Sequence, residues 1–139
     1  MASAAFAVKA EIRDPQAEVF AFLRQKTMYG GKSIAAGDMI YLFASENGGG
    51  RGLIARGVVV SSERVARQPG TERQTPRVNL SIRRTALARR PLGRGELRPF
   101  TDWNDGQPET ELNFKVYRQA TNKVAGISAE AAAFLDDFF

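Results

Sequence analysis

The sequence predicts an α+β fold in which a curled mixed sheet of five or six short strands forms a pseudobarrel with flanking helices. Three observations predict it. Several apolar runs alternate with polar residues at a period of two, which is typical of strands. Clusters of Gly, Pro and Asn separate these runs, as turns between short strands do. Apolar residues also follow a helical spacing near each end of the chain.

The N-terminal elements come first. Apolar residues alternate with polar ones over residues 6–12, which predicts a strand with one face in solvent. Asp14 followed by Pro15 is typical of a helix start, and the apolar residues that follow keep a helical spacing. We therefore expect a helix over residues 15–26 and a flexible loop over residues 29–33.

The middle of the chain predicts three more strands. The continuous apolar run 39–44 is typical of a strand buried on both faces, and a Gly-rich hairpin connects it to a second strand over residues 53–60. Gly57 interrupts that strand and indicates a bulge or a close backbone approach. A further alternating run predicts a strand over residues 78–83.

The C-terminal part begins with residues that break regular structure, over positions 91–99. Alternation then predicts a strand over residues 112–117. Ser128 precedes apolar residues at helical spacing, so it is expected to cap a C-terminal helix.

Composition bounds the possible functions. The chain has 139 residues with 43% hydrophobic content, which fits a single domain over residues 1–139. It contains neither Cys nor His, so a disulfide, a thiolate metal site and a His-based catalytic triad are all excluded within one chain. We expect no metal, no cofactor and no enzymatic activity. The N-terminus does not resemble a signal peptide, and no apolar run reaches membrane-spanning length, so we expect a cytoplasmic protein without membrane contact.

A run of arginines is the most informative stretch. Residues 64–98 contain ten arginines, no lysine and two acids, for a net charge of +8, while the whole chain carries +5. Guanidinium groups stay charged and suit phosphate and base edges. Such a one-sided segment is typical of a nucleic-acid binder. A solvated basic surface is the alternative.

Several short motifs resemble a known family. Gly37-Asp38, the apolar strand after it, the Gly-rich hairpin and the run Ile54-Ala55-Arg56-Gly57-Val58 resemble PUA-like domains, and the chain is most similar to the EVE domain. The helix opened by Ser128 resembles the end of such a domain. The resemblance covers roughly residues 28–139. EVE domains usually open with a strand containing Trp, where this chain has Phe6-Ala7-Val8.

The resemblance implies a nucleic-acid-associated module that holds a modified or flipped base in a pocket at the barrel mouth. Such a pocket needs a flat ring for stacking and a few polar groups. The expected ligand-binding residues are Tyr29, Lys32, Ser33, Ser45, Asn47 and Trp103. The arginines expected to contact phosphates are Arg64, Arg67, Arg77, Arg83, Arg84, Arg89 and Arg90. The partner is therefore expected to be nucleic acid; RNA or DNA, and the oligomeric state, are left open.

Other interpretations stay open at this point. The chain is alternatively a small enzyme on a nucleotide-like substrate, using Lys32 or a carboxylate such as Glu46. It is alternatively a protein-interaction domain that uses the Arg-rich segment to dock an acidic partner or to form a dimer. An acidic cluster that could hold a cation, but that better fits a solvated loop, consists of Asp102, Asp105, Glu109 and Glu111.

Overall fold

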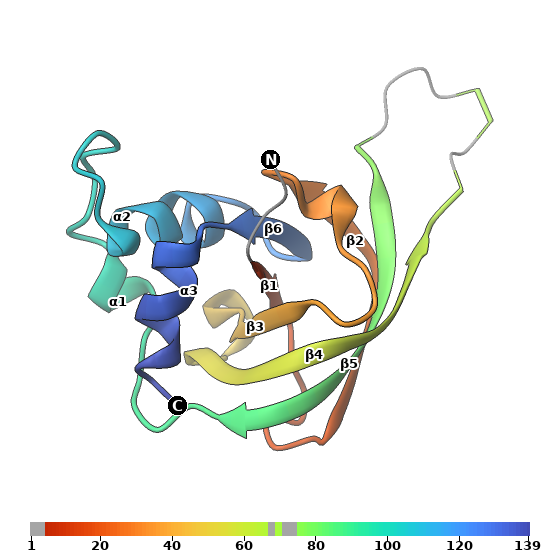
Figure 1. Cartoon of the computed structure of the whole chain (residues 1–139), viewed down its shortest axis with the longest axis horizontal. Coiled ribbons are helices and arrows are strands. Elements are labelled where there is room, and N and C mark those ends of the chain that lie inside the picture. Colours follow the sequence, from red (N-terminus) through yellow and green to blue (C-terminus); the bar gives the residue numbers. More distant parts are fainter. Residues whose placement is uncertain (1–4, 67–68, 71–74) are drawn as a thin grey trace.

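The computed structural model describes residues 5–66, 69–70 and 75–139, which form a barrel with helices on one side (Figure 1). The described residues form six strands, closed in the order β1-β3-β4-β5-β2-β6. Two neighbouring pairs, β1 with β3 and β2 with β6, are parallel, and the other pairs are antiparallel. This mixed, closed sheet confirms the predicted α+β pseudobarrel. The strands are β1 (Ala5–Ala10), β2 (Val19–Met28), β3 (Met39–Ala44), β4 (Gly52–Arg64), β5 (Arg77–Leu87) and β6 (Lys123–Ile127).

Short helices gather on the side of the barrel where β1, β3 and β6 lie (Figure 1). The β4–β5 hairpin instead extends beyond the barrel as a two-stranded arm. The α-helices are α1 (Arg94–Leu97), α2 (Pro108–Leu112) and α3 (Ala129–Asp136). The remaining helical turns are the 3-10 turns η1 (Gly31–Ser33) and η2 (Glu46–Gly48) and the π-turn η3 (Asn113–Tyr117).

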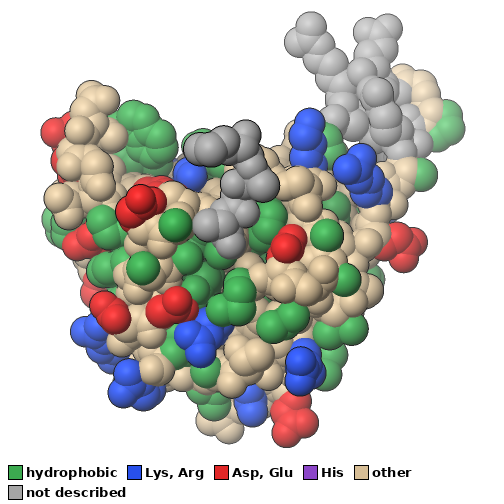
Figure 2. All heavy atoms as spheres, viewed as in Figure 1, with side chains coloured by type: hydrophobic (Ala, Val, Ile, Leu, Met, Phe, Trp, Pro, Cys, Tyr) green, Lys and Arg blue, Asp and Glu red, His purple; other side chains and the backbone are tan. Residues whose placement is uncertain are grey.

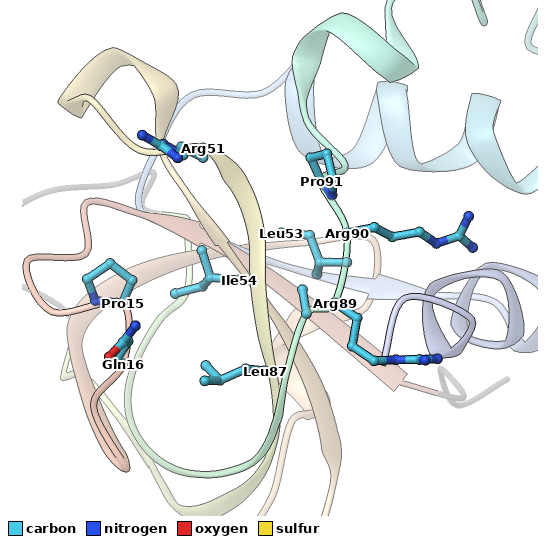
Figure 3. A pocket seen from close by; sticks show the side chains of 10 residues that line it. Pro15, Gln16, Arg51, Leu53, Ile54, Leu87, Arg89, Arg90 and Pro91 are labelled. Carbon is cyan, nitrogen blue, oxygen red and sulfur yellow. The ribbon is translucent and has the colours of Figure 1, made fainter.

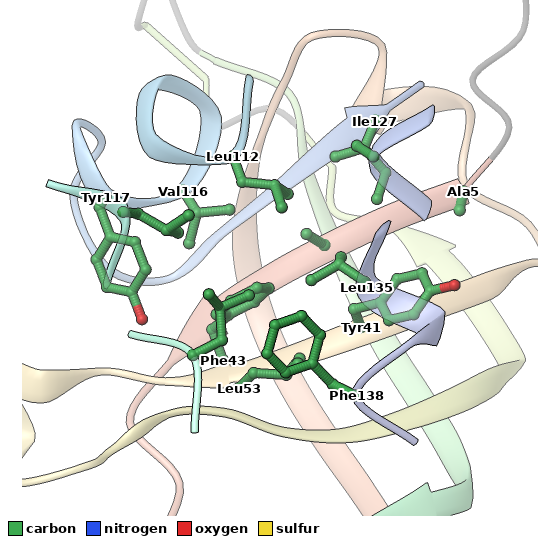
Figure 4. Close-up of a cluster of buried hydrophobic side chains, with 14 residues drawn as sticks. Ala5, Tyr41, Phe43, Leu53, Leu112, Val116, Tyr117, Ile127, Leu135 and Phe138 are labelled. Atoms are coloured by element: carbon green, nitrogen blue, oxygen red, sulfur yellow. The ribbon is translucent and has the colours of Figure 1, made fainter. Parts of the chain in front are cut away.

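Two hydrophobic clusters stabilise the molecule. One fills the barrel and includes Phe6, Val8 and Ile40, while the other lies between the outer barrel face and the helices. Figure 4 shows the second cluster, in which Tyr41 and Phe43 of β3 meet Leu135 and Phe138 at the C-terminus. Successive residues of a strand point to opposite faces, so β1 and β3 each contribute side chains to both clusters.

The prediction of a solvent-exposed face on the first strand is therefore wrong. Every residue of β1 is buried, including Lys9, because the helical layer covers the face that carries the alternate residues. The continuous apolar run of β3 is buried as predicted, and its Tyr41 belongs to the core.

The predicted helix over residues 15–26 is also wrong. Residues 19–28 form strand β2, which pairs with β5 and β6. Phe20 and Phe22 are buried while Val19 and Leu23 are exposed, which is the two-residue period of a strand. Pairing with two neighbouring strands therefore decides the structure against the local helix-start signal at Asp14 and Pro15.

The predicted strand over residues 112–117 is also wrong, because these residues are helical. Pro108 lies in the first turn of α2, and that helix continues into the π-turn η3. Leu112 and Val116 lie one helical turn apart, and both are buried in the cluster under the helices. The alternation of apolar residues here reflects a helix whose buried face is broad.

Two local predictions are confirmed. Ser128 caps α3, because its Oγ accepts a hydrogen bond from the Ala131 amide at 3.1 Å. Gly57 lies where the backbone comes close to its neighbour, since a Cβ at that position would lie 2.7 Å from the Arg83 carbonyl oxygen.

Candidate nucleic-acid interface

A buried lysine marks the end of strand β1 nearest the helices. The Lys9 side chain donates from Nζ to the Gln119 carbonyl at 2.7 Å, and Nζ lies 5.2 Å from the centre of the Tyr117 ring. Burial lowers the pKa of Lys9 to about 8, and the Arg94 charge acts in the same direction while Glu46 opposes it. Lys9 is thus a cation held in a confined position among polar groups.

Tyr117 adjoins Lys9 with its hydroxyl buried. Among the described residues, Oη has no partner in hydrogen-bonding geometry. Burial raises the pKa of the Tyr117 phenol well above its usual range, and the neighbouring Glu46 carboxylate adds to this. Gly52 begins β4 beside this phenol with a φ of +84°, and a Cβ there would lie 2.3 Å from the Leu92 carbonyl oxygen and 2.8 Å from Oη, so glycine is required at this position.

Glu46 joins two segments beside this phenol. Its Oε2 accepts a hydrogen bond from the Arg94 amide at 2.8 Å, which connects the turn after β3 to the start of α1. The Arg94 guanidinium lies 5.9 Å from the centre of the Tyr117 ring. Lys9, Glu46, Arg94 and Tyr117 therefore form one cluster, which we call the Lys9 cluster, of two cations, one carboxylate and one phenol.

Tyr29 lies next to this cluster and is exposed. Gln119, whose carbonyl accepts the Lys9 bond, donates from Nε2 to the Tyr29 hydroxyl at 3.3 Å. The Tyr29 ring is 43% exposed, and the Lys115 ammonium lies 5.3 Å from its centre. Tyr29 has a φ of +50°, in the left-handed region that bulky residues rarely adopt. One residue, Gln119, thus connects an exposed aromatic ring to the buried Lys9.

The other predicted ligand-binding residues lie in different surroundings. Lys32 and Ser33 are exposed in η1, directly after Tyr29, and the Ser33 hydroxyl donates to the Gly30 carbonyl at 2.9 Å. Ser45 is only 3% exposed, although Asn47 in the next turn is open to solvent.

Trp103 is 52% exposed and rests edge-on against Phe114, with 4.9 Å between ring centres. Its partner Phe114 also accepts, through its carbonyl, a bond from Gln119. The π-turn η3 therefore carries contacts to both exposed aromatic residues, Trp103 through Phe114 and Tyr29 through Lys115.

The described members of the predicted phosphate-contacting arginines are spread along β4, β5 and the segment that follows β5 rather than gathered in one patch. Arg64 and Arg77 lie on the arm, and Arg83 is exposed in the middle of β5. Figure 2 shows acidic and basic side chains mixed on the visible face, with basic ones where the arm leaves the barrel. Arg67 lies outside the described residues.

Three of these arginines make contacts within the chain. Arg84 donates from Nη1 to the Gln16 carbonyl at 2.6 Å and to the Ala17 carbonyl at 3.2 Å, which holds the β1–β2 loop against β5. Arg77 donates to the Arg24 carbonyl at 3.2 Å. Arg90 lies over the Phe138 ring at 4.2 Å.

The acidic residues around Trp103 accept hydrogen bonds within the chain. Asp102 and Asp105 accept backbone amides two residues ahead, and Asp105 also accepts the Thr110 hydroxyl at 2.8 Å. Glu111 instead accepts hydrogen bonds from Ser128 and Lys115. No group of three or more acidic residues in the described part of the chain is arranged to hold a metal ion.

Sequence reasoning missed Lys9, Arg94 and Gln119 as members of the site, and it weighed Glu46 only as a catalytic carboxylate. The available signal was Lys9 itself, a lone charge in the run Ala5–Ala10 of small and apolar residues. No helix in the described residues is both long and apolar enough to cross a membrane.

The fold matches solved structures of low sequence identity. No protein-family model matches the chain, and no curated protein matches its sequence. The DUF55 domain of human thymocyte nuclear protein 1 matches with a TM-score of 0.62 at 12% identity, over 94% of this chain and 95% of that one. Human THYN1 protein in complex with 5-methylcytosine containing DNA gives 0.62 at 11% identity, over 95% of each chain. Protein PSPTO5229 from Pseudomonas syringae gives 0.59 at 18% identity, over 98% of this chain and 100% of that one. These likenesses support a PUA-like fold.

Proposed function

We propose that this chain is an EVE-like nucleic-acid-binding module that holds a modified or flipped base against Tyr29, while arginines of the β4–β5 hairpin contact phosphates. The fold supports the proposal, since a similar structure is that of human THYN1 with DNA containing 5-methylcytosine. The net charge of +8 over residues 64–98 supports a polyanionic partner.

The conformation of Tyr29 carries the proposal. A tyrosine at φ +50° is strained, and strained backbone persists mainly where the structure uses it to present a functional group. Here it holds an aromatic ring that is 43% exposed instead of packing it in the core. Exposed rings of this kind stack on unpaired bases.

Polar groups for reading the base edge lie beside the ring. Lys32 and Ser33 follow Tyr29 in the exposed turn η1, so an ammonium and a hydroxyl are close along the chain. The Gln119 side chain donates a hydrogen bond to the Tyr29 hydroxyl, which helps to fix the position of the ring. Trp103 adds a second exposed ring over η3, suited to a neighbouring base.

The geometry favours binding over catalysis. Lys9 has the lowered pKa that a lysine nucleophile needs, but it is 5% exposed and bonded to the Gln119 carbonyl. The Glu46 carboxylate already accepts a hydrogen bond from the Arg94 amide. Both groups therefore make bonds within the Lys9 cluster or to Gln119, which favours a structural role over contact with a substrate.

Substitution of Tyr29 tests the proposal. Affinity is measured by fluorescence anisotropy on matched oligonucleotides with cytosine or 5-methylcytosine, single- and double-stranded, as DNA and RNA. Loss of stacking in Tyr29→Ala should cost about 1–3 kcal/mol on the preferred strand and remove the base preference. Tyr29→Phe keeps the ring at the same strained φ and serves as the matched control.

The salt dependence separates the two parts of the proposal. Tyr29→Ala should leave the slope of log affinity against log salt unchanged, because the Tyr29 side chain carries no charge that neutralises a phosphate. An unchanged base preference in Tyr29→Ala would overturn the base site. Absence of binding to every oligonucleotide would overturn the nucleic-acid function as a whole.

A further inference from the structure

A shallow depression of about 350 Å³ lies on a face of the barrel away from Tyr29, and two of the predicted phosphate-contacting arginines, Arg89 and Arg90, belong to its lining (Figure 3). It lies between the β1–β2 loop, the beginning of β4 and the segment that follows β5. Its apolar lining includes Pro15, Ile54 and Leu87, and its basic lining consists of Arg51, Arg89 and Arg90. Neither Tyr29 nor any member of the Lys9 cluster lines it.

A β-bulge shapes the floor of the depression. Leu42 pairs with Ala55 and Phe43 pairs with Leu53, so Ile54 is an extra residue in β4 without a partner on β3. Such a bulge re-aims a side chain, and bulges are common beside binding sites. Figure 3 shows Ile54 and Leu87 directed to the side on which Pro15 lies. Arg84 holds the Pro15 loop in place through its bond to the Gln16 carbonyl.

The apolar floor is open to solvent. Leu87 is 39% exposed, and Pro15 is exposed as well. Pro91 also lines the depression, so its surface combines apolar side chains with the arginine side chains.

The charge of the lining is uniformly positive. It contains three arginines and no carboxylate. Among the described residues, the Arg51 and Arg89 side chains form no hydrogen bond or ion pair with the protein, while Arg90 reaches the Asp137 carbonyl at 3.4 Å. In Figure 3, Arg51 lies at one end, and Arg89 and Arg90 extend from the end of β5 toward α3. Arg51 is thus the lining arginine on the side to which Ile54 and Leu87 are directed, where it can receive an anion.

The depression adjoins the Lys9 cluster at its Arg51 end. A Cβ at Gly93 would lie 3.5 Å from the Arg51 carbonyl oxygen and 3.0 Å from the Glu46 carboxylate. The depression and the Lys9 cluster therefore adjoin at Gly93. A Cβ at Gly52, next in the chain after Arg51, would lie 2.8 Å from the Tyr117 hydroxyl, so the start of β4 also lies close to this cluster.

We propose that this depression is a second nucleotide subsite, in which an unstacked nucleotide places its base on Ile54 and Leu87 and its phosphate on Arg51. The inference rests on the proposed function, because the nucleotide belongs to the strand whose base is held at Tyr29. An apolar floor with arginine edges matches a nucleotide better than free phosphate, which has no apolar part, or an acidic side chain, which has no flat ring.

Nucleotide titration followed by amide NMR tests the subsite directly. Cytidine monophosphate should shift the amide signals of Ile54, Leu87 and Ala88, with weaker binding by cytidine and by inorganic phosphate. Leu87→Asn and Arg51→Gln should each weaken CMP binding about tenfold. Leu23→Asn and Arg98→Gln, at an exposed leucine and an exposed arginine outside the lining, should leave it unchanged.

Four results would overturn the subsite: no shift of these amides with CMP, equal binding of inorganic phosphate, equal binding of a hexaglutamate peptide, or weakened CMP binding in the control variants. Tyr29→Ala keeps the two proposals apart, since it should abolish base preference in oligonucleotides while CMP still shifts the Ile54 amide. Loss of the base preference in Tyr29→Ala without CMP shifts in the wild type would leave the proposed function standing and remove the second subsite.

Discussion

Tyr41 and Asp136 join the buried strand β3 to the last helix, since the Tyr41 hydroxyl donates to Oδ1 of Asp136 at 2.5 Å. The same oxygen accepts Nη1 of Arg56 on β4 at 2.9 Å. A carboxylate near the C-terminal end of a helix opposes the helix dipole. The bonds from Tyr41 and Arg56 explain why Asp136 is nevertheless found at the end of α3. Burial, together with the Asp136 carboxylate, raises the pKa of the Tyr41 phenol well above its usual range.

Asp136→Ala should lower the free energy of unfolding by about 1–2 kcal/mol, because the buried Tyr41 hydroxyl loses its carboxylate acceptor and keeps only the longer bond to the Ala132 carbonyl at 3.2 Å. Most of the loss comes from Tyr41, since Arg56 and Asp136 form a partly exposed ion pair of small net value. Urea denaturation at neutral pH measures it. Asp137→Ala removes the neighbouring exposed carboxylate and should change stability little; an equal loss in both variants would contradict this account.

Glu111 should make stability depend on acid. Burial alone would raise its pKa, but the bonds from Ser128 and Lys115 outweigh burial and lower it. The folded pKa then lies below the unfolded value of 4.5, so this stabilisation is present above that value and is lost as pH falls below it. Glu111→Gln should therefore be less stable than the wild type at pH 7, with a smaller difference near pH 3.5, as measured by urea denaturation at both pH values.

A Glu109→Gln variant controls for the loss of one charge on the same helix, and it should lack this pH-dependent difference. Equal behaviour of the two variants at both pH values would show that the bonds from Ser128 to Glu111 do not stabilise α3.

Lys9 should act on stability at alkaline pH. Its pKa is lowered from 10.5 to about 8, so between these values the unfolded chain binds more protons than the folded one. Stability contributed by this group therefore rises with pH across that window, in contrast to a group with a raised pKa. Lys9→Met should remove the rise, measured by urea denaturation from about pH 7.5 to 9, below most of the range where the tyrosines titrate.

The titration of Lys9 itself can be followed by NMR of its side-chain carbon atoms. A single transition with a midpoint near 8, absent in Lys9→Met, is the expected result. A midpoint close to 10.5 would show that water reaches the ammonium group more freely than its 5% exposure indicates.

Arg83 and Arg84 are adjacent in sequence and should give different phenotypes. Arg83 is exposed, so Arg83→Ser should flatten the salt dependence of nucleic-acid binding by about 0.7–0.9 for each phosphate that it neutralises, with little change in stability. Arg84 is bonded to the Gln16 and Ala17 carbonyls, so Arg84→Ser should lower the free energy of unfolding by about 1 kcal/mol. Denaturation and salt-dependent anisotropy on both variants separate the two effects, and identical results would contradict the distinction.

The fold class was predictable because period-two alternation and turn residues are local signals. The errors arose where distant partners decide the structure. Val19 and Phe20 follow a helix-start signal, yet pairing with β5 makes them a strand. Leu112 and Val116 alternate as in a strand, yet the start of α2 at Pro108 makes them helical.

The candidate site was predictable only in part. Tyr29 stood out as an aromatic residue among glycines and polar residues, and it is exposed as expected. Lys9 was assigned to a solvent-exposed face because the sequence does not show that helices from residues 94–136 cover that face. Gln119 contacts Lys9 through its backbone carbonyl, and such a contact leaves no trace in residue type, while its side-chain bond to Tyr29 depends on the fold.

The closed barrel also limits how this protein can associate with other chains. β4 is paired on its β3 side only as far as Val59, which exchanges hydrogen bonds with Gly37 and Asp38. In the described residues, the segment 60–64 beyond it has β5 as its sole strand neighbour. That open edge carries Glu63 and Arg64, and charged side chains at a free edge discourage pairing with a foreign strand. Replacing both residues by Val would remove the charges from this free edge. The edge could then pair with a strand of another molecule, and the protein should become prone to aggregation.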